Sequence, residues 1–378
     1  MFKFSIIIPV FQNYNIFSLF THSLLDSLEE KTQIILIDDA SPEEVNKEIC
    51  HLEQIRNQIF SIQTITHTTS MGCAKSINEA LLLVKGEFVV LMDSDIIVKK
   101  SWQQTVIRSF STPEIGCVGG VLLYPQTNGI QCCGITYTCG TGRHLKLNAR
   151  PESVGNDIYE VQASIFAFLT IKLEIINEIG LLNDEFFNGY EDWDYQMRIR
   201  QAGYKIIINP DLQFYHWEKS NGIHRAYNRK SNLGIFWKKH GYFIREDLWN
   251  FIFPQIDKLT EKTDFIGIDI CSSRLDAETF WHQSTEHTPG LISECLDYSY
   301  QIKDNAPIWL LDVLHYDFLR TPSKILFLCD NFVQLTDNHY WINLRERYCQ
   351  NDIIVDLYGN VTPFMDLTST CWPGNKIR

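Results

Sequence analysis

The sequence predicts an α/β protein, with a doubly wound, mostly parallel sheet in its first part and a smaller second α/β unit after it. Short apolar runs rich in β-branched residues alternate with segments of helical periodicity along the opening of the chain. The same alternation restarts near Phe251–Pro254. Such alternation is typical of a parallel sheet, because each parallel connection needs a crossover segment. With 378 residues the chain is long enough for two domains, which we expect at residues 1–250 and 251–378.

The first elements follow one another in the order that such a sheet requires. The helix after the second strand has the clearest start, with Ser41 as N-cap, Pro42 at the first helical position and Glu44 completing a capping box. We expect this helix to run to about Gln58. The other expected elements are strands at Phe4–Val10, Gln33–Ile37, Ser61–Thr66 and a run ending at Asp93, with helices at Phe17–Glu30 and Ala74–Val84.

After Trp102 the pattern loosens into short strands and turns. A helix is expected from Glu191 to Ala202, with Gly203 at its C-terminus. The strand "YKIIINP" and then the segment "LQFYHWEKSNG" follow it. Further short strands are expected at Gly116–Tyr124, Gly134–Tyr137 and Glu160–Thr170, and in the second unit within "DFIGIDIC", "APIWLLDVL", "KILFLCD" and "DIIVDLYG".

The composition excludes several classes of protein. A net charge of −13 argues against generic nucleic-acid binding. Eleven cysteines, an odd count without a C-x-x-C pair, predict reduced and mostly buried thiols rather than disulfides or structural zinc. The best candidate for a membrane span, Ala163–Ile176, is interrupted by Lys172 and Glu174. Because the N-terminus also lacks signal-peptide character, we expect a cytoplasmic protein whose membrane contact, if any, is peripheral.

Carboxylates gather where the expected strands end. Asp93 and Asp95 follow a buried strand in "LMDSDIIV", and burying either one without a partner is costly. The pair Asp38-Asp39 and the loop "SMG" close two other strand ends. Ligands of doubly wound sheets bind beyond the carboxyl ends of the strands. We therefore expect these groups to meet in one cleft that holds a cation.

A set of motifs in fixed order indicates the family. The stretches are "SIIIPVFQN", "LIDDAS", "SMGCAKSINEAL", "LLYPQTNGIQCCGITY", "GLLNDEFFNGYEDWDYQMRIRQAGY" and "FYHWEKSNG", which span about residues 4–222. Together they resemble inverting family 2 glycosyltransferases of the GT-A fold, and most of all the bacterial subgroup that builds O-antigen and capsular polysaccharide. The resemblance implies transfer of a sugar from a UDP-sugar to a hydroxyl of a saccharide or polyprenyl-diphosphate-linked acceptor, with Mn²⁺ or Mg²⁺ as cofactor.

The resemblance also implies a metal site. Asp95 corresponds to the direct ligand, and Asp93 lies near the ribose or holds a metal-bound water. His216, in "YHWEKSNG", is expected to complete the metal site or to touch the diphosphate, with Lys219 and Ser220 as further phosphate partners. A divalent cation neutralises the charge of the diphosphate. The alternative for the two aspartates is a solvated turn after a strand.

Other residues match the nucleotide-binding positions of the family. Asp39 is expected to accept the base N–H, which uracil, thymine and guanine all carry, whereas Asp38 is the less certain partner because it can cap the following turn. Lys75 either reaches the nucleotide or is solvated. The remaining expected contacts are the wall Pro9, Val10 and Phe11 and the loop residues Ser70 and Gly72.

Three acids at one helix start supply the candidate catalytic base. Glu191, Asp192 and Asp194 lie where the helix dipole stabilises anions. Asp194 is expected to pair with Arg198 four residues later. In the family pattern the acceptor-facing aspartate is Asp192, with Glu191 in reserve.

Two regions leave alternatives open. Lys219–Arg245 contains seven Lys or Arg and no acid, interleaved with aromatic residues. It either faces an anionic partner, such as the membrane or a polyprenyl-diphosphate acceptor, or packs its aromatics on the domain and exposes its lysines. Residues 251–378 are the start of a second transferase domain or an oligomerisation or docking module.

Two other functions compete with sugar transfer. A sugar nucleotidyltransferase shares the architecture, but it needs a glycine- and arginine-bearing loop after the first strand, where this chain has "PVFQNYN". A degenerate nucleotide-binding or scaffold protein would not require Asp93, Asp95, Asp192 and His216 together.

Overall fold

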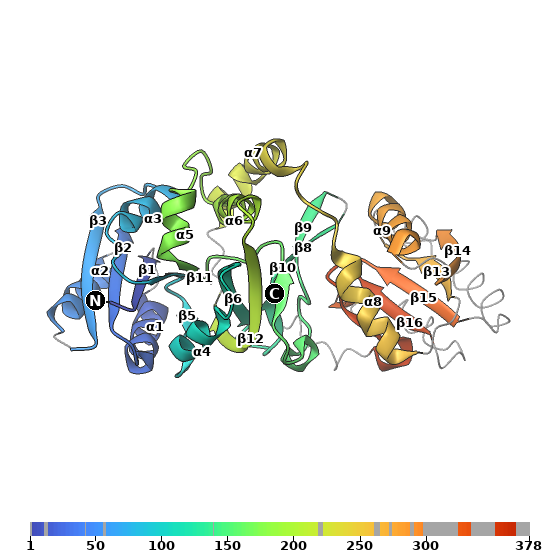
Figure 1. Cartoon of the computed structure of the whole chain (residues 1–378), viewed down its shortest axis with the longest axis horizontal. Coiled ribbons are helices and arrows are strands. Elements are labelled where there is room, and N and C mark those ends of the chain that lie inside the picture. The colour runs from blue at the N-terminus through green and yellow to red at the C-terminus, as the bar shows by residue number, and fades with distance from the viewer. Residues whose placement is uncertain are drawn as a thin grey trace. The chain divides into compact units, whose positions relative to one another are not determined.

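The computed structural model divides into two compact units (Figure 1). It describes residues 2–10, 14–41, 43–55, 58–138, 140–217, 222–260, 265–271, 274–287, 291–297, 324–333 and 352–367. Unit 1 consists of Met1–Gln126, Gln131–Ile135 and Val154–Ile244, and unit 2 of Thr127–Ile130, Thr136–Ser153 and Arg245–Arg378. The chain therefore passes into the second unit twice before residue 245, a feature that no local sequence pattern indicates.

Unit 1 is built on a 10-stranded sheet with the order β10-β12-β6-β11-β4-β1-β2-β3, to which β5 and β7 are added at β12 and β6. The strands are β1 Phe4–Val10, β2 Thr32–Asp39, β3 Phe60–His67, β4 Phe88–Met92, β5 Ile96–Ile97, β6 Ile115–Leu123, β7 Ile130–Cys132, β10 Tyr159–Val161, β11 Phe168–Lys172 and β12 Lys205–His216. Strand β1 is parallel to its two neighbours β2 and β4, β2 is parallel to β3, and β12 is parallel to β6. Strand β11 is antiparallel to both β4 and β6. The predicted α/β class with a large, mostly parallel sheet is confirmed.

Helices cover both faces of this sheet. Figure 1 shows α3, α5 and α6 above the strands and α1 and α4 below them. This arrangement follows from right-handed crossovers, because the chain moves outward from β1 to β3 and then returns to β4. The helices of unit 1 are α1 Tyr14–Ser27, α2 Glu43–Gln54, α3 Cys73–Leu81, α4 Trp102–Ser109, α5 Leu173–Ile179, α6 Glu191–Gln201 and α7 Gly222–His240.

The central strands form because each has a run of residues that are apolar on both faces. All residues of β2 and β4 are buried, and in β1 only Pro9 is partly exposed. Continuous apolar runs of this kind are typical of parallel strands covered by helices on both sides. The edge strand β3 is mostly half-exposed and more polar. Because β1, β2 and β4 run in the same direction, their carboxyl ends lie at the same end of the strands, where Val10 is paired with Asp38. We call this end the carboxyl edge of the sheet.

Strand β12 differs from the sequence-based expectation. The segments "YKIIINP" and "LQFYHWEKSNG" form one strand through Pro210, with a register shift between Ile208 and Gln213. A bulge tolerates proline because the extra residues do not donate to the ladder. The expected strand Glu160–Thr170 is instead two strands, β10 and β11, at separate places in the sheet. Beyond the bulge, Tyr215 and His216 pair antiparallel with Ile97 and Ile96 of β5.

Unit 2 has its own sheet of five strands, ordered β14-β13-β15-β16-β17. All pairs are parallel except β16 with β17. Three of the four expected strands are present as β13, β15 and β16, whereas "APIWLLDVL" lies outside the described residues. Trp249, Ile252 and Phe280 belong to the core on one side of this sheet. The elements are α8 Leu248–Leu259, β13 Phe265–Asp269, α9 Arg274–His287, β14 Ile292–Asp297, β15 Lys324–Cys329, β16 Ile353–Asp356 and β17 Val361–Pro363, and a separate hairpin is formed by β8 Ile135–Thr138 and β9 Thr141–His144.

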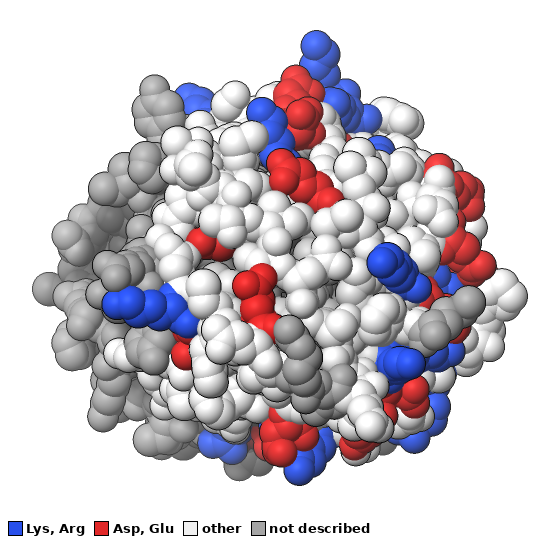
Figure 2. Space-filling model, turned by 90° about the vertical axis from the view of Figure 1, so that its left-hand side faces the viewer, with Lys and Arg blue, Asp and Glu red and all other residues white. Residues whose placement is uncertain are grey.

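Three global properties bear on the expected environment. Among the described residues, no helix combines the length and apolar character that crossing a bilayer requires. The cysteines whose side chains are described are free thiols, and all except Cys50 and Cys73 are buried, as predicted. On the face shown in Figure 2, acidic and basic residues are interspersed, without a continuous basic surface among the residues coloured there.

Candidate active site

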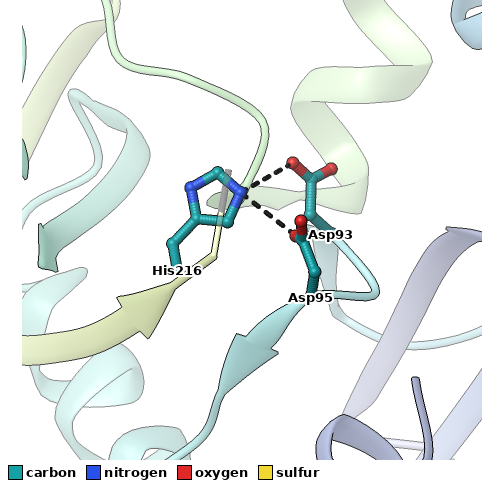
Figure 3. Close-up of side chains that lie close together, drawn as sticks. All are labelled: Asp93, Asp95 and His216. Carbon is teal, nitrogen blue, oxygen red and sulfur yellow. Dashed lines mark ion pairs between the residues drawn. The ribbon is translucent and has the colours of Figure 1, made fainter. Parts of the chain in front are cut away.

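Asp93, Asp95 and His216 meet at the carboxyl edge of the sheet in unit 1 (Figure 3). His216 Nε2 lies 3.1 Å from Asp95 Oδ1 and 3.6 Å from Asp93 Oδ2. The meeting results from the pairing of β5 with the end of β12, reinforced by a hydrogen bond of 3.0 Å from Trp217 N to Asp95 O. One ligand atom from each residue lies within 4.8 Å of the others, a spacing at which one cation can touch all three.

The orientation of His216 is set by Gln131. The His216 Nδ1 atom is hydrogen-bonded to Gln131 Oε1, and both side chains are buried. Since this amide oxygen can only accept, Nδ1 carries a proton, and Nε2 is the ring atom that points toward the two carboxylates and can bind a metal ion. Two carboxylate oxygens and one neutral imidazole nitrogen form a donor set that fits a divalent metal ion with positions left for phosphate and water. Sequence reasoning missed Gln131, although it lies inside the motif "GIQCCG".

Asp39 organises the loop between β3 and α3. Its Oδ1 accepts hydrogen bonds from Met71 N and His67 Nδ1, both at 2.8 Å, and its Oδ2 accepts from Ser70 Oγ at 2.6 Å and Gly72 N at 3.4 Å. Burial would raise the pKa of the Asp39 carboxyl, but these hydrogen bonds outweigh it and lower the pKa. A carboxylate offers about four lone-pair sites. A base N–H at Asp39, which stays a prediction, must therefore share or replace one of these donors.

His67 extends this network to the surface. Its Nε2 lies 3.2 Å from Glu79 Oε2, so the imidazole bridges Asp39 and Glu79. Burial by itself lowers the pKa of His67, but the hydrogen bonds and charges of the two acids outweigh it and raise the pKa. The neighbouring Asp38 accepts a hydrogen bond of 2.9 Å from Ser41 N. Asp38 thus caps the turn after β2, the alternative considered from the sequence.

The remaining predicted nucleotide contacts are distributed as follows. Pro9 and Val10 end β1 beside β2, and Lys75 is exposed on α3. Gly72 has φ +84° and precedes α3, where a Cβ would lie 2.9 Å from the Phe187 ring, so only glycine fits this close approach. Phe11, Lys219 and Ser220 lie outside the described residues.

A left-handed turn leads into the candidate base. Asn188, Gly189 and Tyr190 have φ values of 52°, 141° and 72°, and α6 begins at Glu191 directly after them. The buried Glu191 carboxylate folds back to accept a hydrogen bond from Gly189 N, whereas Asp192, which accepts from Trp193 N, is partly exposed. Of the two acids, Asp192 is therefore the more accessible to an acceptor.

Asp194 has a different role from its neighbours. Its Oδ2 lies 3.2 Å from Arg198 Nε, which confirms the predicted pair, and its Oδ1 lies 2.8 Å from His240 Nε2. Arg198 also donates to the carbonyl oxygens of Ile179 and Leu181. Asp194 and Arg198 are buried or half-buried structural anchors of α6, which separates them from the accessible Asp192.

Cys73 lies where the metal-side and helix-side acids converge. Burial raises the pKa of the Cys73 thiol well above its usual range, and the nearby carboxylates of Glu191, Asp93 and Asp192 raise it further. The thiol at the start of α3 is therefore close both to Asp93 of the metal cluster and to Glu191 and Asp192 of α6. The loop after β4 and the first residues of α3 and α6 therefore lie close together, whereas a single cleft shared with Asp38 and Asp39 stays a prediction.

Helix α7 covers this region with one face and exposes basic residues on another. Phe236 is fully buried, with its ring centroid 5.6 Å from that of Tyr190 and 5.9 Å from that of Trp193. The exposed basic residues of the segment are Arg229, Lys230, Lys238, Lys239 and Arg245. Phe236 is buried as the second alternative from the sequence requires, whereas Tyr242 and these cations are exposed, so the packing is compatible with both alternatives.

A protein-family model matches part of unit 1. Residues 5–131 match the family model Glycosyl transferase family 2. For that segment the match agrees with the resemblance to family 2 glycosyltransferases drawn from the motifs. The matched segment contains Asp39, Asp93, Asp95 and Gln131.

Individual proteins are similar over part of their length. The uncharacterized protein y4gI of Sinorhizobium fredii is 26% identical over 233 residues, which cover 58% of this chain and 25% of y4gI. The glycosyltransferase GlyG of Streptococcus pneumoniae is 22% identical over 226 residues, which cover 59% of this chain and 73% of GlyG. The match thus spans only a quarter of y4gI.

A solved structure shares the fold. The crystal structure of GalNAc-T7 with UDP, GalNAc and Mn²⁺ superposes with a TM-score of 0.50 at 14% sequence identity. The superposition covers 84% of this chain and 59% of the GalNAc-T7 chain. It supports the GT-A type of fold for this protein.

Proposed function

We propose that unit 1 is a metal-dependent, inverting glycosyltransferase that moves a sugar from a nucleoside-diphosphate sugar to an acceptor hydroxyl. The observation that carries the proposal is the Asp93, Asp95 and His216 cluster, with Nε2 aimed at both carboxylates. It lies at the carboxyl edge of a sheet where doubly wound proteins bind nucleotides. The family match over residues 5–131 supports the same activity.

The donor set favours Mn²⁺ over Mg²⁺. Mg²⁺ strongly prefers oxygen ligands, whereas Mn²⁺ accepts an imidazole nitrogen beside carboxylates more readily. When bound, the cation would neutralise the charge that develops on the diphosphate as it leaves. Asp95 and His216 are the proposed direct ligands, and Asp93 the ligand to ribose or to metal-bound water.

Asp192 is the proposed general base. The acceptor hydroxyl gives its proton to the Asp192 carboxylate while its oxygen bonds to the anomeric carbon from the face opposite the nucleotide. The bond between that carbon and the diphosphate oxygen breaks, and the nucleoside diphosphate leaves with the electron pair. Glu191, engaged with Gly189 N, holds the turn that presents Asp192.

The proposed donor carries a pyrimidine, with UDP favoured over dTDP. The support is Asp39 at the end of β2 and the narrow loop at Ser70–Gly72. Calorimetry should give UDP with Mn²⁺ a lower Kd than GDP, and GDP binding at least about tenfold tighter, roughly 1.4 kcal/mol, would contradict the proposal. A screen of nucleotide sugars by nucleotide release, with and without Mn²⁺, then identifies the sugar. Release of pyrophosphate from a nucleoside triphosphate and a sugar phosphate would instead indicate the nucleotidyltransferase.

We further propose a role in bacterial cell-surface polysaccharide synthesis, such as O-antigen or capsule, on a saccharide or polyprenyl-diphosphate acceptor. The exposed cations of Lys219–Arg245 are the proposed contact with an anionic membrane surface. We expect the protein to sediment with phosphatidylglycerol vesicles at low salt but not with phosphatidylcholine vesicles. Glutamine at Arg229, Lys230 and Lys238 should reduce the bound fraction. Absence of sedimentation with the anionic vesicles would exclude the membrane contact.

A further inference from the structure

The inward face of α7 presents one buried amide to the turn before the candidate base. Asn232, Phe236 and His240 are spaced by four residues and therefore lie on one side of the helix. Asn232 is 3% exposed, and Phe236 and His240 are equally well buried. Of the three, Asn232 is the residue that bonds the backbone of the turn.

Asn232 makes two hydrogen bonds to the backbone of the turn. Its Nδ2 donates hydrogen bonds to Phe187 O at 3.1 Å and to Gly189 O at 2.9 Å, so the two carbonyls that flank Asn188 share one amide group. The three residues Asn188, Gly189 and Tyr190 all have positive φ. Asparagine adopts positive φ more readily than most residues, but a bulky residue such as Tyr190 does so only where surrounding contacts enforce it. The two bonds from Asn232 are such contacts.

The held turn is linked to both halves of the site. Asn188 Oδ1 accepts a hydrogen bond of 2.9 Å from Cys73 N, the first residue of α3 and the neighbour of the loop organised by Asp39. On its other side the turn continues directly into Glu191 and Asp192. His240 lies on the same side of α7, about two turns after Asn232. Its Nε2 is 2.8 Å from Asp194 Oδ1, which anchors α6.

We propose that Asn232 is a positioning residue of the transfer reaction, which holds the turn 187–190 so that Asp192 faces the acceptor. This inference rests on the proposed function. The two hydrogen bonds of Asn232 go to the turn, and the turn reaches the loop at Asp39 only through Asn188 and Phe187, so loss of Asn232 should affect the chemical step more than donor binding. A displacement of about 1 Å at a catalytic group costs on the order of 10²-fold in rate.

The test compares two variants of the full-length protein. Asn232→Leu removes both hydrogen bonds while it keeps the number and branching of the side-chain heavy atoms, and Ser231→Ala changes the exposed neighbour on the same helix. Once a donor is known, Asn232→Leu should lower kcat on the order of 10²-fold with a much smaller change in the KM for the donor. Ser231→Ala should match the wild type. Wild-type kcat in Asn232→Leu, or a loss of kcat accompanied by an equal loss of UDP and Mn²⁺ affinity, would overturn the proposal.

Hydrogen exchange gives a readout that does not depend on activity. In Asn232→Leu the amides of residues 187–191 should exchange faster than in the wild type, while those of β1 and β2 keep their protection. Asn232→Asp, which keeps the shape but replaces the donating amide by an acceptor, should show the same local change. Unchanged exchange in both variants would overturn the positioning role. If the wild type transfers no sugar, the proposed function fails, and the exchange experiment still decides whether Asn232 holds the turn.

Discussion

Asp192→Asn is expected to lower turnover by about 10²–10⁴-fold while leaving the affinities for UDP and Mn²⁺ unchanged. Asparagine keeps the shape of the side chain and its acceptor for Trp193 N, but it cannot take up the proton of the acceptor hydroxyl. The proposed binding sites for nucleotide and metal lie on other elements, at Asp39, Asp93, Asp95 and His216. Steady-state transfer kinetics and calorimetry with UDP and Mn²⁺ are the two measurements.

Glu191→Gln is the matched control for this prediction. Its amide oxygen can still accept the hydrogen bond from Gly189 N, so the turn should be kept and activity largely retained. Asp194→Asn is a less useful control, because Asp194 is buried between Arg198 and His240 and its loss disturbs packing. A fully active Asp192→Asn together with an inactive Glu191→Gln would move the base by one residue.

Asp95→Ala is expected to abolish most Mn²⁺-dependent donor binding and transfer. Asp93→Ala should have a smaller effect, because Asp95 is closer to His216 Nε2, at 3.1 Å against 3.6 Å, and its side chain is less exposed, at 22% against 44%. Gln131→Leu, which removes the partner of His216 Nδ1, should weaken Mn²⁺ affinity by about 10–100-fold, as losses of such hydrogen bonds typically do.

Direct metal titration separates these variants, with paramagnetic Mn²⁺ followed by electron spin resonance in the presence of UDP. Asp211→Ala, an exposed acid on the same strand as His216, should leave Mn²⁺ affinity unchanged and controls for nonspecific charge effects. Full transfer activity in excess EDTA would refute the metal requirement. Wild-type Mn²⁺ affinity in Gln131→Leu would show that the histidine does not need its buried partner.

Several elements could be predicted from the sequence because their signals are local. The strand Phe4–Val10 was predicted with the bounds that the structure has, and the apolar run before Asp93 is β4. Both are strands buried on two faces, so each contains a short, mostly apolar run that the sequence displays. The pairing of Asp194 with Arg198 was predictable for the same reason, since helical spacing alone brings them together.

Elements with mixed signals were predicted less well. The strand expected at "YKIIINP" ended at Pro210, whereas β12 continues to His216, because the sequence does not reveal that a bulge will absorb the missing N–H. The passage of Thr136–Ser153 into unit 2 has no local signature either, since it depends on contacts with residues far along the chain. The order of strands in the sheet is likewise a result of packing, although the alternation of strands and helices restricts it.

The sequence by itself thus determined the fold class, the strand ends that carry Asp39, Asp93 and Asp95, and the helix start that carries Asp192. Only the tertiary structure decided how these groups are held. Gln131 and His216 are 85 residues apart, and Asn232 and Gly189 are 43 apart, so neither contact leaves a periodic pattern. Asp39 was expected to face a base, but its oxygens also bind the backbone of the next loop. Local patterns record which residues are buried, whereas the direction of a buried hydrogen bond depends on which partner the folded chain brings within reach.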